Sequence, residues 1–426
     1  MIHCFDHSIS FKEAGAAREI GLENTLTQNP FQLDYSLLQR ELPIKSIVAS
    51  TYLRTVQPYL SHLVSQENFK DILSLSRYFP GNMTSFLGFE CRLGEPETRA
   101  DWAFAISGVG GDRRVFAHLL QSGFFPDYLL EQPEWNSIAR FAHLWVDKES
   151  MVNAKVKCFW LEFDMPSSRS SELPIPRVFF GPSLVPTGTS SNDASQYQWL
   201  TDLALPALKG QPLTETMEGN IQECIHQLPA NAMLFQVGTT LSPSPTDVRL
   251  YINRLAPSQI VPYLKSLDWA DGSLALARLV QELKNHADRF VLSYDVTENG
   301  IGSRIGIECS FTPNRFHKER RWSNLLDFLV QKQVCLPEKR DALLHYPGVE
   351  EDAFAGEVKA PLVTASKILG DLRSSVLVRY INHVKLVYQP GLPLEAKAYP
   401  AVRLFERPYK TTMKYDKIEK AVSHCT

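Results

Sequence analysis

From about residue 81, the chain alternates between two kinds of hydrophobic pattern. Short runs in which every second residue is apolar come in pairs, and each pair precedes a stretch whose apolar residues lie three or four apart. Period two is typical of a strand with one buried face, and a period near 3.6 is typical of a helix. The arrangement recurs along the chain, so we predict five repeats, each a β-hairpin followed by helices.

Turn residues inside the pairs support the hairpins. T-E-N-G-I-G separates the two runs of the fourth pair, and P-G-L-P separates those of the fifth. Helical periodicity follows in stretches such as P-S-Q-I-V-P-Y-L-K-S-L and L-A-L-A-R-L-V-Q-E-L-K. The predicted strands are 85–93 with 101–107, 157–165 with 176–182, 232–238 with 247–255, 290–296 with 303–311, and 383–390 with 394–402.

The second strand of each later hairpin has a polar face opposite its apolar one. Arg249 and Tyr251 alternate with apolar residues in the third hairpin, Arg304 holds the matching face in the fourth, and Lys397 and Tyr399 do so in the fifth. An open sheet could turn these faces to water, whereas a closed barrel would bring them together in a lumen. Recurrence of Arg-x-Tyr and Lys-x-Tyr favours the barrel, since solvated faces give no reason for such repetition.

The predicted fold class is therefore α+β, a ten-stranded antiparallel β-barrel of five ββαα repeats surrounded by a ring of helices. Several Arg, Lys and Tyr donors at one level of its lumen would suit a polyanion such as a diphosphate. Residues 1–80 mix short amphipathic patterns with Pro and Asn and predict a helical segment packed on the barrel. The barrel domain is predicted over 81–410, with a tail at 411–426, and V-E-E-D-A-F near residue 350 is predicted to be a solvated loop.

Composition narrows the function classes. The 426 residues are 44% hydrophobic, and 44 basic against 47 acidic residues give a formal charge of −3. No long basic run marks a nucleic-acid or membrane face, so any basic site must be local. The N-terminus lacks a basic segment followed by an apolar one, and no stretch approaches 18 apolar residues. We expect a soluble cytoplasmic protein with neither nucleic acid nor membrane as partner.

Cysteine and histidine spacing gives no sign of a metal or cofactor. The seven scattered cysteines include no C-x-x-C, which predicts free thiols in a reducing compartment. The sequence has no H-E-x-x-H and no Cys/His ligand spacing. It also lacks the D-D-x-x-D of magnesium-dependent isoprenoid synthases. We therefore expect no tightly bound cofactor, with a magnesium requirement left open.

Five ββαα units closing into a barrel resemble the ABBA aromatic prenyltransferases, a group that includes the dimethylallyltryptophan synthases and, more distantly, cyanobactin peptide prenyltransferases. The resemblance spans roughly residues 80 to 403. F-W-L-E-F-D-M then P-R-V-F-F-G-P is similar to the family's F-L-A-F-D-L then V-K-A-Y-F-F-P, with Arg177 at the Lys position and Phe179 at the Tyr position. D-V-R-L-Y-I is similar to R-L-K-I-Y-V, with Arg249 and Tyr251 matched and Asp247 in place of Arg.

The resemblance implies transfer of a dimethylallyl or geranyl group from its diphosphate, the co-substrate, to an aromatic small molecule such as an indole or phenol, or to a peptide side chain, as in natural-product biosynthesis. Glu90 in S-F-L-G-F-E-C-R-L is similar in place to the acid of P-I-E-L-S-W that takes the proton from the nucleophile. The implied diphosphate-binding residues are Arg177, Arg249, Arg304 and Lys397, and those implied to shield the allyl cation are Tyr251, Tyr399 and Trp160.

Two alternatives stay open. Glu90 could instead be a lumen carboxylate paired with Arg92 on its own face. The whole chain could be a non-catalytic barrel that binds a peptide or an apolar ligand, which Phe179, Asp247 and the absence of an Arg from 101–107 favour.

Overall fold

A computed structural model describes residues 49–84, 86–108, 112–121, 123–166, 174–182, 194–241, 247–269, 273–351 and 373–408. Within them the ten predicted strands are all present and form one antiparallel barrel. Its strands are β1 (Phe86–Arg92), β2 (Ala100–Ser107), β3 (Val156–Phe163), β4 (Arg177–Pro182), β5 (Met233–Thr239), β6 (Val248–Asn253), β7 (Arg289–Thr297), β8 (Gly300–Ser310), β10 (Arg373–Tyr388) and β11 (Glu395–Pro408).

Pairing of the last strand with the first closes the barrel. The strands follow one another around the sheet, and β11 pairs both with β10 and with β1, where Lys397 faces Arg92 and Arg403 faces Phe86. The predicted barrel is confirmed, and the open sheet is wrong, because the edges that an open sheet would expose are paired with each other.

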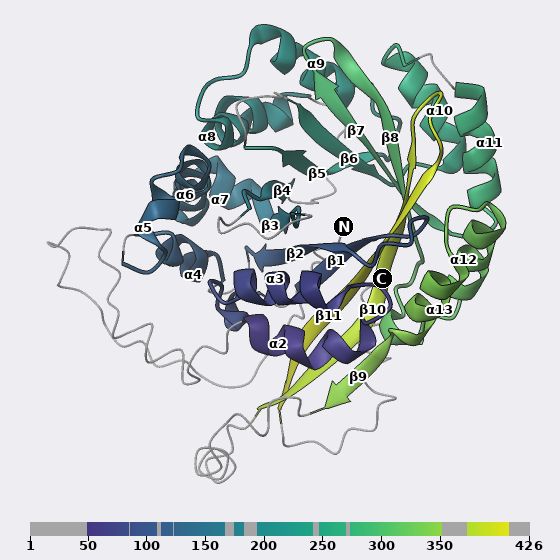
Figure 1. Ribbon diagram of the computed structural model, residues 1–426. Helices are drawn as coiled ribbons and strands as arrows, with labels where there is room; N and C mark the ends of the chain where they lie inside the picture. The colour runs from purple at the N-terminus through teal and green to yellow at the C-terminus, as the bar shows by residue number, and fades with distance from the viewer. Residues whose placement is uncertain are drawn as a thin grey trace, which may run out of the picture.

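The helices lie outside the strands, as Figure 1 shows. Outward side chains such as Val178, Phe180, Ile305 and Ile307 are buried in one apolar core shared with the helices. The helices are α2 (Ala49–Val56), α3 (Gln66–Ser76), α4 (Asp112–Leu119), α5 (Asp127–Leu130), α6 (Pro133–Val146), α7 (Met151–Lys155), α8 (Leu205–Lys209), α9 (Glu215–His226), α10 (Pro257–Ser266), α11 (Ser273–Leu283), α12 (Trp322–Gln331) and α13 (Pro337–His345), with short turns η1 (Gln57–Tyr59), η2 (Gly81–Met83), η3 (Ala194–Tyr197), η4 (Leu200–Ala204) and η5 (Phe316–Lys318).

The segment before the barrel is helical where it is described. Helices α2 and α3 precede β1, and the Phe69 ring stacks on Phe89 of β1 with centroids 6.2 Å apart. Residues 1–48 of the predicted N-terminal segment, and the predicted tail at 411–426, lie outside the described residues. The boundaries at 80 and 410 therefore stay predictions.

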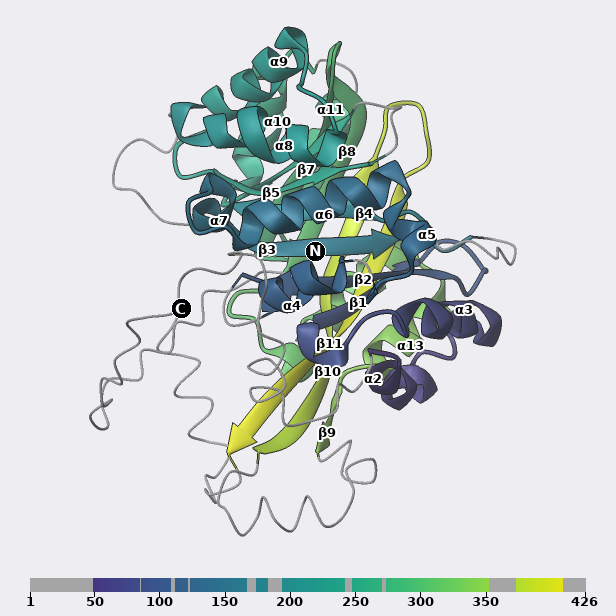
Figure 2. The same cartoon turned by 90° about the vertical axis from the view of Figure 1, so that its left-hand side faces the viewer.

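The fifth hairpin is longer than predicted. Strand β10 begins at Arg373 and β11 continues to Pro408, so both run past the barrel, where a further strand, β9 (Gly348–Glu351), pairs with β10. Figures 1 and 2 both show these three strands projecting beyond the barrel. The predicted solvated loop near residue 350 is thus wrong, since Glu350 lies in β9 and forms an ion pair of 2.6 Å with Arg379 of β10.

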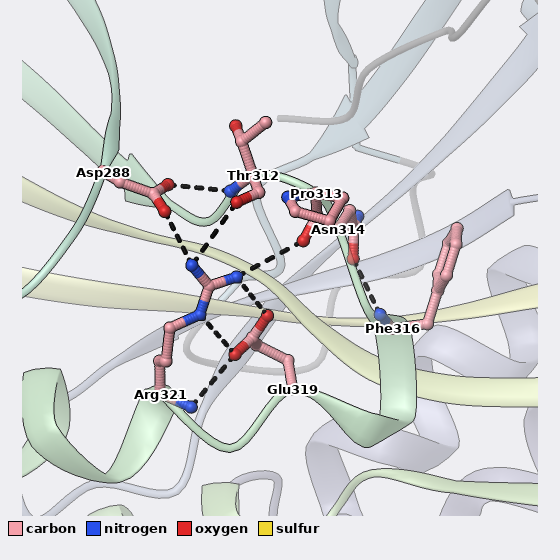
Figure 3. Close-up of polar contacts among 7 residues, drawn as sticks. All are labelled: Asp288, Thr312, Pro313, Asn314, Phe316, Glu319 and Arg321. Carbon is pink, nitrogen blue, oxygen red and sulfur yellow. Dashed lines mark hydrogen bonds and ion pairs between the residues drawn. The ribbon is translucent and has the colours of Figure 1, made fainter. Parts of the chain in front are cut away.

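The loop after β8 packs against one end of the barrel. The Phe316 ring meets Tyr380 of β10 edge-on, with centroids 5.0 Å apart. Figure 3 shows the Arg321 guanidinium that holds this loop, which donates to Glu319 at 2.7 Å and to Asp288 at 2.6 Å. Arg321 also donates longer hydrogen bonds to the carbonyl oxygens of Thr312 and Pro313, at 3.4 and 3.3 Å.

Replacing Arg321 with Ala is expected to lower the free energy of unfolding by about 1–3 kcal/mol, because the buried Glu319 carboxylate would lose its partner. Solvent will offset part of that loss, since the Arg321 side chain is 38% exposed. Urea denaturation measures the effect, and Arg92→Ala is the matched control because its pair with Glu95 lies at the surface. Equal destabilisation by both substitutions would contradict this role of Arg321.

The structure bears on two expectations from the sequence, that the cysteines are free thiols and that no segment spans a membrane. Cys91, Cys224, Cys309 and Cys335 are buried free thiols, as predicted. The prediction is wrong for Cys158, which is disulfide-bonded. In the described part of the chain, none of the helices has the length and apolar character needed to span a bilayer.

Candidate active site

A second apolar cluster lies inside the barrel, separate from the core between strands and helices. Strand alternation turns Tyr251 inward while its neighbours Leu250 and Ile252 join the outer core. The rings of Trp160 and Phe179 belong to this inner cluster, and Phe179 meets Tyr251 edge-on at 6.0 Å. Two of the residues implied to shield an allyl cation, Trp160 and Tyr251, are therefore buried together in the lumen.

The charged side chains of the lumen lie toward the end that carries the hairpin turns. All four cations implied to bind diphosphate lie there, in the first halves of β4, β6, β8 and β11. Each has a carboxylate partner, and the pairs of Arg249 and Lys397 are largely buried whereas those of Arg177 and Arg304 are open to water. The pairs are Arg177 with Asp164 (3.0 Å), Arg249 with Asp295 (2.7 Å), Arg304 with Glu395 (2.9 Å), and Lys397 with Glu90.

Glu90 on β1 is held by two residues of β11. Lys397 Nζ donates to one carboxylate oxygen and the Tyr399 hydroxyl to the other. Burial alone would raise the pKa of Glu90, but the Lys397 charge and these hydrogen bonds bring it down to about 2. Glu90 is therefore ionised at neutral pH. The alternative pairing with Arg92 is wrong, because Arg92 lies instead beside Glu95, at 4.0 Å.

Lys385 on β10 is a lumen cation that the sequence analysis did not single out. Its register places it between Lys397 of β11 and Glu308 of β8, and Nζ lies 5.1 Å from the centroid of the Tyr251 ring. Lys385 is 5% exposed and makes neither a hydrogen bond nor an ion pair with another described residue. Burial, followed by repulsion from Arg249, lowers its pKa to about 8.

A glycine makes room for this lysine. A Cβ at Gly306 of β8 would overlap both Lys385 Cε and the Ser293 hydroxyl. The sequence does contain a signal for Lys385, since H-V-K-L-V-Y alternates polar with apolar residues in the same way as the strands whose cations were recognised.

Glu162 on β3 is a second ionisable lumen residue that the sequence patterns did not predict. Its register places it between Ala103 of β2 and Arg177 of β4, and it is 7% exposed. Burial, followed by repulsion from Glu90, raises its pKa to about 8. Nearby Asp101 of β2 has a pKa raised to about 6 by the same two causes, although it accepts a hydrogen bond of 2.8 Å from the Met165 amide.

Glu90 and Glu162 line one pocket of about 360 Å³, a volume that includes space open to solvent. Its walls are largely aromatic, and the His383 ring stacks on Tyr399 with centroids 4.0 Å apart. The pocket is lined by Phe86, Gly88, Phe89, Glu90, Ala103, Trp160, Glu162, Phe179, His383 and Tyr399. The enclosed space is only about 20 Å³, so a flat apolar ring could lie against these walls, with a carboxylate at hand, only after lining side chains move aside.

Metal ligands do not gather in this region. Within the described ranges, no group of three or more His, Cys, Asp or Glu side chains is placed to hold a metal ion. The residues that could hold an anion are Lys385 and the ion-paired cations around it.

Comparisons with known proteins find similarity only among solved structures. The sequence matches no protein-family model and no curated protein. Apo prenyltransferase PriB is 12% identical, with 82% of this chain and 94% of that chain covered and a TM-score of 0.45. AnaPT from Neosartorya fischeri is 11% identical (88% and 98% covered, TM-score 0.48). The 5-dimethylallyl tryptophan synthase of Streptomyces coelicolor, in complex with DMASPP and Trp, is 12% identical (87% and 98% covered, TM-score 0.43). Each of these similarities extends over most of both chains.

Proposed function

We propose that the protein transfers a dimethylallyl or geranyl group from its diphosphate to an aromatic acceptor, an indole or a phenol, either free or as a peptide side chain. The observation that carries the proposal is one aromatic pocket with an ionised carboxylate, Glu90, and a buried unpaired ammonium, Lys385, in the same lumen. The family resemblance of the sequence motifs points to the same chemistry.

The diphosphate would lie against Lys385 and the arginines near it. Lys385 is buried and makes no ion pair with a described residue, and the charges of Glu308 and Glu90 compensate its burial only in part, so an anion there would remove an existing cost. Arg249 donates from Nε and Nη2 to Asp295, and its side chain also lies beside the Tyr251 hydroxyl. Arg304 donates to Glu395 from Nη2 only. Ion-paired arginines thus keep N–H donors for phosphate oxygens.

The reaction breaks the bond between C1 of the prenyl group and the diphosphate oxygen, and the electron pair leaves with the diphosphate. The rings of Trp160, Tyr251 and Tyr399 would stabilise the allyl cation, and the surrounding cations would neutralise the leaving group. An electron pair of the acceptor then forms the new bond to the prenyl carbon. The acceptor's proton passes to Glu90, which with a pKa of about 2 is a weak base but suffices because a protonated arene is a strong acid.

Mass spectrometry of the purified protein with dimethylallyl and geranyl diphosphates, with and without magnesium, tests the proposal. Tryptophan, tyrosine and short aromatic peptides serve as acceptors. We expect an acceptor to gain the mass of one prenyl unit, and we expect the product to fall by at least about 100-fold in Arg249→Ala, since several phosphate contacts would be lost. Absence of product with every acceptor, together with no rise in melting temperature on adding either diphosphate, would overturn the transferase.

The ion pairing of all four implied cations, and Phe179 at a Tyr position, favour a second candidate, a non-catalytic barrel that binds a peptide or an apolar ligand. The same melting experiment separates the two functions. A barrel of that kind has no reason to be stabilised by an allylic diphosphate, whereas the transferase must be.

A further inference from the structure

Charge in the lumen is divided between two sides. The carboxylates of β1, β2 and β3 lie together, whereas most of the Lys and Arg side chains come from β4, β6, β8, β10 and β11. Asp295, Glu308 and Glu395 offset part of the positive charge on that second side. Cations from the other side pair with Glu90 and Asp164, and a backbone amide serves Asp101. Only Glu162 in this acidic group makes no hydrogen bond or ion pair with another described residue.

An unpartnered carboxyl at this position is costly. Glu162 is 7% exposed, lines the pocket, and is repelled by Glu90, Asp164 and Asp101, while Arg177 of β4 attracts it without forming an ion pair. A buried polar group without a partner costs about 1–3 kcal/mol. The similar family motif, F-L-A-F-D-L, has Ala at the position of Glu162 in W-L-E-F-D-M, so the resemblance itself assigns the carboxyl no role.

We propose that Glu162 binds a cationic group of the acceptor, an ammonium or a guanidinium, and so fixes the acceptor's orientation in the pocket. The inference rests on the proposed function, because it names the class of acceptor for that site. Glu162 and Glu90 lie on the same pocket, with the aromatic walls of Trp160 and Phe179 beside them. The acceptor's cation would lie on the acidic side and the diphosphate on the side of Lys385, which matches the division of charge in the lumen.

A cation suits this site better than a neutral donor does. The groups that act on Glu162 are Glu90 from β1, Asp101 from β2, Asp164 from its own strand and Arg177 from β4, with Tyr251 and Tyr399 also close. Three of these are carboxylates, whose combined field favours positive charge. Because the cation favours the ionised form of Glu162, binding should release a proton near pH 7, and affinity should rise with pH until about 8.

Isothermal titration of the full chain tests the inference, with and without a dimethylallyl thiolodiphosphate analogue. The probes are matched pairs, tryptamine with indole-3-ethanol for an ammonium, and N-acetyl-Trp-Arg amide with N-acetyl-Trp-citrulline amide for a guanidinium. We expect at least one cationic member to bind about 10-fold or more tightly than its neutral partner, with proton release seen as a dependence of the heat on buffer. Glu162→Gln should abolish both the preference and the release.

Two further variants serve as controls for the Glu162→Gln result. Glu162→Ala restores the residue of the similar family motif and should behave as Glu162→Gln does, while Glu149→Gln, at an exposed site, should keep the wild-type preference. Equal binding within both pairs, no binding of any probe, or a preference that survives both Glu162 variants would overturn the inference. Failure of the thiolodiphosphate to bind would instead count against the transferase, since the titrations without analogue still measure cation binding at Glu162.

Discussion

Replacement of Lys385 by Met is expected to lower kcat/KM for the allylic diphosphate by about 10²- to 10³-fold. Nζ is a buried positive charge, 5.1 Å from the Tyr251 ring centroid, and it makes no ion pair with a described residue. An ammonium aimed at a departing diphosphate in a water-poor site is worth roughly 3–4 kcal/mol. Met keeps most of the volume of the side chain and removes only the charge. Steady-state kinetics with varied diphosphate measure the loss.

The control for this substitution is Lys70→Met, which removes an exposed lysine of α3 and should leave kcat/KM unchanged. A thermal melt shows whether the Lys385 variant is folded. We expect it to be at least as stable as the wild type, since a buried unpaired charge is removed. Unchanged diphosphate kinetics in a folded Lys385→Met protein would show that the diphosphate does not lie against this lysine.

Titration of Lys385 should make diphosphate binding depend on pH. Its pKa of about 8 is set by burial and by Arg249, with Glu308, Glu90 and Lys397 also acting on it. A bound anion raises the pKa of a lysine, so diphosphate binding should be strongest below pH 8 and weaken as pH rises through that value. In Lys385→Arg, the guanidinium stays charged and this weakening should disappear. A profile that is the same in both proteins would assign the titration to another group.

Replacement of Glu90 by Gln is expected to lower kcat by about 10²- to 10⁴-fold with little change in KM for the diphosphate. The amide keeps the shape of the side chain and an oxygen for the hydrogen bond from Tyr399, but it cannot take the acceptor's proton. Loss in kcat without loss of binding is what removal of a group that acts in the transition state produces. Single-turnover experiments with saturating diphosphate separate this step from product release.

Glu131→Gln provides a matched control for Glu90, since it makes the same change at an exposed position between α5 and α6. The Glu90 variant is also informative if transfer persists. Wild-type kcat in Glu90→Gln would mean that the acceptor's proton leaves by another route, and Glu162, on the same pocket, would then be the group to replace next.

Alternation of apolar and polar residues in the sequence determined which segments are strands and which side chains face the lumen. Each of the ten predicted strands exists, because a strand buried on its outer face by helices must repeat every second residue. The same parity, read from the sequence alone, puts Arg177, Arg249 and Lys397 on the inner face. The alternation did not predict β9 or the far half of the fifth hairpin. These strands project beyond the barrel, where they need not bury one face and expose the other.

The partners of the lumen residues were decided only by the tertiary structure. Glu90 and Lys397 are 307 residues apart, and their contact exists because β11 pairs with β1 to close the barrel. For Lys385 the alternation in the sequence indicates the inner face, but nothing in the sequence around Lys385 or Glu162 says that these side chains lack an ion-pair partner among the described residues. Parity tells which face a side chain takes, but the charge that it meets there is set by strands distant in sequence.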